Sequence, residues 1–306
     1  MNSKRRVAKR LSCRKDGRGV EMDRRGVWSG RIAVLFIVLV LCARTMRAQT
    51  LYVLNCDGGS GVNVFSMDGT VLKKFIPLGG AACTAMAVDK AGRFYVGVAG
   101  NFNNVRVFNP DGKQIGSWNL GIGVGGLAIG PDGKIYVAGG YNGKIVIKNF
   151  NPDGSHAGLV INTDNFDSAK GLALDSSGNI YLATMTGLMR YDSTGKPIGK
   201  MFVVPRDNPR CVAIAPDGKF YAGYYLPVAT FSPEGVHIQP SLHLRMPDGS
   251  QPTPTAVTVG KDGRVYVGYD SVARGKAVVA VFSPDGKMIG KPILTGGGVR
   301  GIYVQE

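Results

Sequence analysis

Six short hydrophobic segments recur along the chain between more polar stretches, and each segment holds an aromatic or aliphatic residue followed by Tyr. The six are Leu51-Tyr52-Val53, Phe94-Tyr95-Val96, Ile135-Tyr136-Val137, Ile180-Tyr181-Leu182, Phe220-Tyr221-Ala222 and Val265-Tyr266-Val267. Their tyrosines are 40 to 45 residues apart. A period of this length, built from short strands, is typical of β-propeller blades, which bury their faces only against neighbouring blades. The pattern predicts one all-β domain, a six-bladed β-propeller over residues 49–306.

Every repeat places the same elements around its Tyr strand. A strand of small apolar residues comes first, as in Gly126–Ile129, and a tight turn such as Pro131-Asp132-Gly133 joins it to the Tyr strand. Asp-Gly between two strands is a strong hairpin signal because Gly accepts the positive φ of the turn. A third strand, a second turn such as Pro284-Asp285-Gly286 and a fourth strand complete the repeat. The small first strands suit the crowded centre of a propeller.

The two ends of residues 49–306 complement each other. The Tyr strand at Leu51 has no small strand before it, whereas Arg300–Val304 resembles a small first strand with nothing after it. We therefore expect the C-terminal strand to pair with the N-terminal blade. This pairing would close the ring and remove an exposed sheet edge.

The repeated residues resemble those of a known superfamily. The Gly-Leu-Ala-(Leu/Ile)-Asp pattern, as in Gly171–Asp175, and the Ile-Tyr-Val pattern, as in Ile135–Val137, are similar to NHL-repeat propellers and to the related gluconolactonase (luciferin-regenerating-enzyme) family. The resemblance covers about residues 50–306 and implies the propeller architecture. It does not select a function, since one fold hosts unrelated sites.

Positive charge is concentrated at the N-terminus. Residues 1–48 hold 13 of the 37 Lys and Arg but 3 of the 21 Asp and Glu, which leaves a net charge of +6 on residues 49–306. A twelve-residue apolar run, Ile32–Ala43, follows the basic segment and is shorter than the roughly 20 residues that a membrane-spanning helix needs. A basic flank, an apolar core and a small residue at Ala48 are typical of a secretory signal peptide.

We therefore predict that residues 1–48 are a signal peptide and that the protein is exported to the periplasm or the extracellular space. An uncleaved membrane anchor is the alternative, in which the membrane is contacted only through this segment. Because the basic lead is long for a signal peptide and Met22 opens one of ordinary length, a translation start at Met22 is a further prediction.

Three cysteines remain in residues 49–306. Cys56 starts the loop after the first Tyr strand, and Cys83 ends the loop that enters the second repeat, so both should lie at the same end of adjacent blades. Exported proteins can keep disulfides. We predict a Cys56–Cys83 disulfide, with Cys211 as a buried free thiol.

The residues that enter the first strands are the best candidates for a site, because these loops converge on the axis. They are Thr84, Gly125, Lys170, Arg210, Thr255 and Arg300. The resemblance implies that gluconolactonase-like lactonases hold a divalent metal with Glu, Asn and Asp at such positions. This chain has neither a carboxylate nor an amide there, and a hard metal needs several charged oxygen ligands. We expect no metal and no cofactor.

Three cations and two hydroxyls would instead surround the mouth of the channel. They belong to Lys170, Arg210, Arg300, Thr84 and Thr255. Converging cations bind carboxylate or phosphate through charge-assisted hydrogen bonds, which predicts a small anion or an acidic peptide as ligand. The alternative is that these side chains are solvated, or paired with acidic residues of the same loops. Those residues are Asp164, Asp167 and Asp207.

Tyrosines that follow the second strands should lie at the same end. They are Tyr141, Tyr224, Tyr225 and Tyr269. If exposed, they would suit a protein or sugar partner, and packing at the strand ends is the alternative. The three histidines, His156, His237 and His243, fall at turns and outer strands and would not meet to hold zinc.

We predict an exported binding or interaction module for a protein, peptide, glycan or small anion. Export and the modest charge of residues 49–306 argue against a nucleic acid partner. The alternative is a gluconolactonase-like propeller hydrolase or lyase with a non-standard site, which tightly held calcium or zinc would favour. We lean towards binding rather than catalysis.

Overall fold

The structure, a computed structural model, describes residues 49–56, 60–100, 104–163, 167–199, 208–225, 227–270 and 277–305. The chain divides into two units, Met1–Arg47 and Ala48–Glu306, and every described residue belongs to the second. The predicted signal peptide and the start at Met22 lie outside the described residues. The described part of the chain contains no helix long and apolar enough to cross a membrane.

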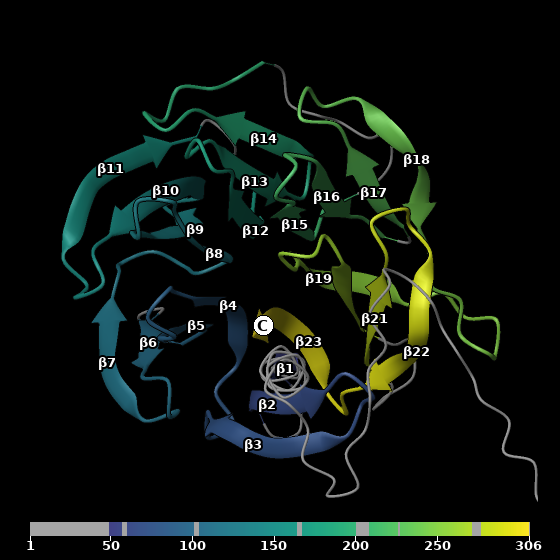
Figure 1. The fold of residues 1–306 in the computed structure, drawn as a ribbon. Coiled ribbons are helices and arrows are strands. Elements are labelled where there is room, and N and C mark those ends of the chain that lie inside the picture. The colour runs from purple at the N-terminus through teal and green to yellow at the C-terminus, as the bar shows by residue number, and fades with distance from the viewer. Residues whose placement is uncertain are drawn as a thin grey trace, which may run out of the picture. The chain divides into compact units, whose positions relative to one another are not determined.

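Six antiparallel sheets stand around a central axis, which confirms the predicted all-β, six-bladed propeller (Figure 1). We name them blades A to F and give each from its inner to its outer strand. Blade A is β23 (Gly298–Gln305), β1 (Thr50–Cys56), β2 (Gly61–Ser66) and β3 (Val71–Pro77). Blade B is β4 (Cys83–Val88), β5 (Phe94–Val98), β6 (Asn104–Phe108) and β7 (Gln114–Asn119). Blade C is β8 (Gly126–Ile129), β9 (Ile135–Tyr141), β10 (Lys144–Phe150) and β11 (His156–Asn162).

The other three blades follow in chain order. Blade D is β12 (Ala169–Leu174), β13 (Ile180–Thr184) and β14 (Leu188–Tyr191). Blade E is β15 (Cys211–Ile214), β16 (Phe220–Gly223), β17 (Val228–Phe231) and β18 (His237–Leu242). Blade F is β19 (Thr253–Val259), β20 (Val265–Asp270), β21 (Val278–Phe282) and β22 (Met288–Leu294). Blade D has three strands within the described residues, where one bridge, Tyr191 to Pro197, follows β14.

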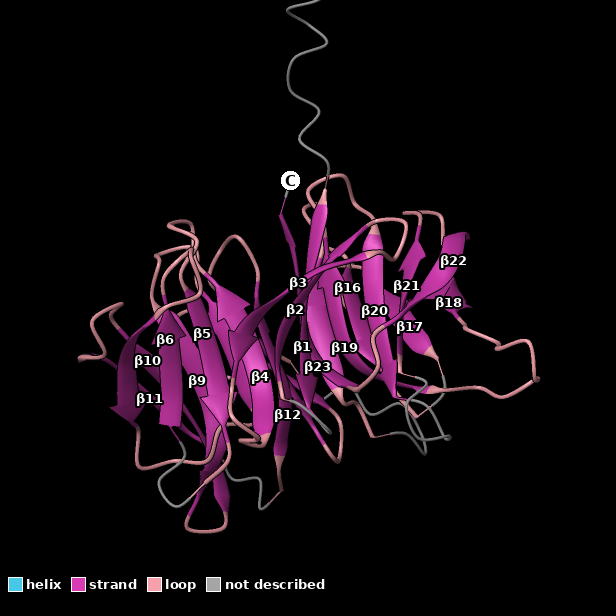
Figure 2. Ribbon diagram, turned by 90° about the horizontal axis from the view of Figure 1, so that it is seen from below, coloured by secondary structure: helices cyan, strands magenta, loops and turns pink. Residues whose placement is uncertain are grey.

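Pairing between the two ends of the domain closes the ring. Strand β23 runs antiparallel to β1 from Thr50 opposite Gln305 to Cys56 opposite Gly298, as predicted. Val299 and Ile302 of β23 are buried in the interface between blades F and A. Figure 2 shows the strands standing side by side between two ends formed by turns and loops.

The inner strands approach one another so closely that glycine is required at their contacts. A Cβ added to Gly126 of β8 would lie 2.9 Å from the backbone nitrogen of Leu172, and one added to Gly171 of β12 would lie 3.0 Å from the Cα of Cys211. Real Cβ atoms at such distances would force the strands apart. The small residues of the first strands thus let neighbouring blades meet at the axis.

The repeated tyrosine links its strand to the first turn of its own blade. The hydroxyl of the buried Tyr95 donates to the Asp89 carboxylate at 3.0 Å, and that of Tyr136 donates to Asp132 at 3.3 Å. Asp89 also accepts from the side chain of Arg93 at 2.7 Å. In blades B and C these bonds tie the Tyr strand to the turn end of the blade, whereas Tyr52 of blade A donates to Gln305 and Tyr266 of blade F to Gln49.

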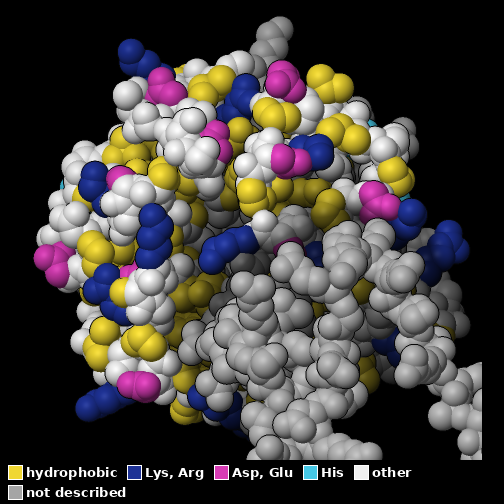
Figure 3. Space-filling view, viewed as in Figure 1, with side chains coloured by type: hydrophobic (Ala, Val, Ile, Leu, Met, Phe, Trp, Pro, Cys, Tyr) yellow, Lys and Arg dark blue, Asp and Glu magenta, His cyan; other side chains and the backbone are white. Residues whose placement is uncertain are grey.

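The end of the propeller drawn in Figure 3 carries Lys and Arg interspersed with Asp and Glu. Four ion pairs within first turns contribute to this mixture, with nitrogen–oxygen distances of 2.7 to 3.3 Å. They are Arg93–Asp89, Lys134–Asp132, Lys219–Asp217 and Arg264–Asp262. Charge at this end is therefore largely balanced within each turn.

Deletion of residues 299–306 should destabilise the whole domain, because it removes the strand that closes the ring together with the buried Val299 and Ile302. Each buried side chain is worth about 2–5 kcal/mol, and we expect the melting temperature to fall by about 10 °C or more. Differential scanning calorimetry measures this. A chain lacking Glu306 alone is the control, and a full deletion that melts like the intact protein would contradict the role of closure.

Asp89→Asn should weaken the fold at neutral pH but not in acid. Burial alone would raise the pKa of Asp89, but hydrogen bonds from Arg93 and Tyr95 outweigh it and lower the pKa below its usual value. The ionised Asp89 thus stabilises the folded state at pH values above its pKa in the unfolded chain, which is about 4. This stabilisation is lost as the pH falls through the lower pKa that Asp89 has in the folded protein. We expect a loss of about 1–3 kcal/mol at pH 7 that shrinks below about pH 4, measured by urea unfolding across pH. Asp111→Asn, at an exposed second turn of blade B, is the control. A loss that does not change with pH would contradict the assignment.

Candidate functional site

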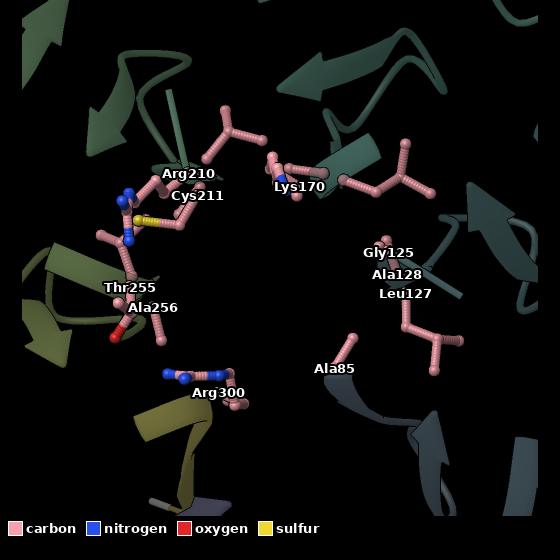
Figure 4. A pocket seen from close by; sticks show the side chains of 18 of the residues that line it. Ala85, Gly125, Leu127, Ala128, Lys170, Arg210, Cys211, Thr255, Ala256 and Arg300 are labelled. Atoms are coloured by element: carbon pink, nitrogen blue, oxygen red, sulfur yellow. The ribbon is translucent and has the colours of Figure 1, made fainter. Parts of the chain in front are cut away.

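A cavity of about 720 Å³ lies at the axis and is lined by the inner strands of all six blades (Figure 4). Its walls are mainly backbone and small or aliphatic side chains, such as Ala85, Ala128 and Ala256. The predicted entry positions Thr84, Gly125, Lys170, Arg210, Thr255 and Arg300 all line it. Each stands at or just before the start of an inner strand, so the fold brings them together at one mouth of the channel. This mouth is at the opposite end from the first turns.

One of the three cations at the mouth is already paired. Nη1 of Arg300 lies 2.7 Å from Oδ2 of Asp270, and Oδ1 of Asp270 accepts from the backbone nitrogen of Val299 at 3.1 Å. Asp270 ends β20 in blade F, next to blade A. The sequence analysis did not select it, because its partner is 30 residues away and only the packing of adjacent blades brings the two together.

Lys170 and Arg210 keep their charges available. Both are exposed, and neither forms an ion pair or a side-chain hydrogen bond with any described residue. The backbone nitrogen of Arg210 donates to Gly223 O at 2.7 Å, which fixes its position beside β16. Figure 4 shows Lys170 on the blade next to Arg210, while Arg210 and Arg300 extend along the wall that holds Thr255. Of the expected acidic partners, Asp167 is described and pairs with neither cation, and Asp164 and Asp207 lie outside the described residues.

The two threonines differ in their hydrogen bonding. Oγ1 of Thr255 donates to Val299 O at 2.8 Å and so links blade F to blade A. Oγ1 of Thr84 is buried without a hydrogen-bond partner among the described residues, and so is Oδ1 of Asn208. Buried polar atoms without partners are rare in proteins. Both residues line the cavity, where they could accept or donate a hydrogen bond to a ligand. Asn208 was missed because the repeat pattern does not extend into its loop.

The tyrosines at this end fall into two pairs. Tyr224 and Tyr269 are 1% and 0% exposed and pack in the core, whereas Tyr141 and Tyr225 are 52% and 58% exposed. Packing therefore accounts for the first pair, and the second pair remains accessible to a partner.

A disulfide joins blades A and B near the same mouth. Cys56 ends β1 and Cys83 begins β4, with their Cα atoms 5.8 Å apart. Cys211 is a buried free cysteine at the start of β15. Burial raises the pKa of its thiol to about 12.

The described residues contain no cluster of three or more His, Cys, Asp or Glu that could hold a metal ion. His156 and His237 lie on β11 and β18, which are the outermost strands of blades C and E. Asp270, the one carboxylate among the described lining residues, is occupied by Arg300. The residues present do not fit the metal site that the gluconolactonase resemblance implies.

Comparisons with known proteins identify the fold alone. No family model matches the chain, and no curated protein matches it. A protein of unknown function from Bacteroides caccae shares the fold with a TM-score of 0.67 and 14% identity, over 84% of this chain and 98% of that one. Virginiamycin B lyase from Staphylococcus aureus has a TM-score of 0.55 and 13% identity, over 81% and 89%. A catalytically inactive histidine-to-alanine variant of that lyase with quinupristin has a TM-score of 0.58 and 14% identity, over 85% and 93%.

Cys211 should resist thiol reagents in the folded protein, because it is buried and its raised pKa leaves little thiolate at pH 8. We expect less than about a tenth of Cys211 to react with iodoacetamide under native conditions that label an unfolded sample fully. Mass spectrometry of the labelled protein measures this. Equal labelling in both states would contradict the burial of this thiol.

Proposed function

We propose that the protein is an exported NHL-type propeller that binds an anionic group at the channel mouth formed by the inner strands. One observation carries the proposal. Lys170 and Arg210 stand on adjacent blades at the edge of a 720 Å³ cavity, and the one carboxylate among the described lining residues is already paired with Arg300. The mouth therefore presents two positive charges that no described acidic residue balances.

The chemistry of these groups favours carboxylate or phosphate as the bound group. Arg offers a planar fork of donors that fits two oxygen atoms, and Lys adds a compact charge on a flexible stem. Thr84 also lines the cavity, but its Oγ1 atom is buried, so the two cations carry the proposal. The cavity volume is also in the range of ordinary ligand pockets, roughly 300–1,000 Å³.

Two features support export. The sequence begins with a basic segment, an apolar run and a small residue, which is the signal-peptide pattern. The Cys56–Cys83 disulfide suits the oxidising conditions outside the cytoplasm.

Catalysis as a propeller hydrolase or lyase is the second candidate, and the shared fold with virginiamycin B lyase favours it. The residues weigh against it. No histidine is found among the described residues that line the cavity, and their one carboxylate, Asp270, is paired with Arg300. Lys170 and the buried Cys211 are the other described lining residues that could act as general acid or base. A stoichiometric, tightly held divalent metal in the purified protein would favour the enzyme over the binding module.

Replacing Lys170 and Arg210 together by Ala should abolish most anion binding. With hexaglutamate as the titrated probe, we expect the Kd to rise by about tenfold or more, since each charge-assisted hydrogen bond is worth about 1.5–3 kcal/mol. Isothermal titration calorimetry at low salt measures the affinity, which should fall as salt is added.

The matched control replaces Lys219 and Lys287 by Ala. It removes the same formal charge from two cations that pair with aspartates of their own turns, Asp217 and Asp285. If the control loses as much affinity as the mouth variant, or if neither loses any, binding does not occur at the mouth and the proposal fails.

A further inference from the structure

The channel mouth is different on its two sides. On blades C, D and E the loops after the second strands expose Tyr141, Met185 and Tyr225, which are 52%, 45% and 58% exposed. We call these three residues the apolar arc. On blade F the residue at the position of Tyr225 is Asp270, which pairs with Arg300, and blades B and A end their second strands in the buried Val98 and the disulfide-bonded Cys56.

The apolar arc lies beside Lys170 and Arg210, the two cations of the mouth that pair with no described residue. Ala169, next to Lys170, is paired with Thr184, the residue before Met185. The backbone nitrogen of Arg210 bonds to Gly223 O, two residues before Tyr225. On blades D and E, therefore, each exposed apolar residue adjoins the entry to an inner strand whose cation has no ion-pair partner among the described residues.

Blade C extends the same arrangement with a different cation. Nζ of Lys148 on β10 lies 5.9 Å from the centroid of the Tyr141 ring. Three consecutive blades thus combine an apolar side chain with a positive charge. On the other side, Arg300 is neutralised by Asp270 and the hydroxyl of Thr255 bonds to the backbone.

Tyr, Met and Arg are enriched in protein interfaces, and the three residues of the apolar arc stand on consecutive blades. A small anion would engage one or two cations and leave the apolar arc uncovered. An extended peptide places its side chains alternately on two sides at about 3.3 Å per residue, so it can bring acidic and apolar groups to three neighbouring blades in turn.

We propose that the mouth binds an extended acidic peptide segment that carries aromatic or aliphatic side chains. Its carboxylates contact Lys170 and Arg210, and its apolar side chains cover Tyr141, Met185 and Tyr225. This inference rests on the proposed anion-binding function and specifies the class of ligand.

Fluorescence anisotropy with three labelled ten-residue peptides tests the inference. The first alternates Glu with Phe and Leu, the second has Gln in place of every Glu, and the third has Ser in place of every Phe and Leu. We expect the first peptide to bind at least about tenfold more tightly than either of the others, because it alone satisfies both the cations and the apolar arc.

Variants of the full-length protein locate the contact. Tyr225→Ser and Met185→Ser should each raise the Kd of the first peptide by about fivefold and leave the Kd of the third peptide unchanged. Leu294→Ser is the matched control, because Leu294 is 64% exposed on β22, an outer strand of blade F, and it should change neither affinity.

The outcomes separate this inference from the proposed function. Suppose that the first and third peptides bind equally well and that the Lys170→Ala/Arg210→Ala variant loses affinity for both. This result overturns the peptide assignment and leaves anion binding in place. If that double variant also binds like the wild type, both proposals fail. If the first peptide does not bind the wild-type protein, the peptide assignment is overturned.

Discussion

The structure depends on the close approach of six inner strands around one axis. At Gly126 and Gly171 the backbone of one blade comes so near to the next that even a methyl group would collide with it. This demand explains the small residues that open each repeat, and it makes the six entry loops converge. The packing of the inner strands therefore brings the entry residues together at the mouth, and the chemistry of the mouth depends on the few side chains that the entry loops carry.

The period of the Tyr strands was enough to predict the six blades and the closure of the ring, because both follow from local strand patterns repeated at nearly constant spacing. The pairing of Arg300 with Asp270 could not be predicted in this way, since it joins two blades and depends on how their loops meet. The same holds for Tyr269, which looks like Tyr141 in the sequence but is enclosed where Tyr141 is exposed. The repeat specifies which residues reach the mouth, and the contacts between blades decide which of them remain available.

The related folds show how little the ring itself determines about function. A protein of unknown function and a streptogramin-type lyase share the architecture with this chain at 13–14% identity. In this ring the inner strands contribute mainly backbone and small side chains to the channel, so the chemistry of the mouth depends on the entry residues. Among the described residues these include Lys170 and Arg210, with Thr84 and Asn208 as neighbours whose buried oxygen atoms have no hydrogen-bond partner in the described part of the chain.

Thr50 of β1 pairs with Gln305 of β23, so the two ends of the domain lie side by side. Both residues lie at the end of the first turns, whereas the mouth opens at the other end. A linker or affinity tag attached after Gln305 therefore begins at the end of the propeller that is opposite the mouth. Protein immobilised through that point would hold the surface at the end opposite the channel mouth, so the strand that closes the ring also sets the side from which the proposed site can be reached.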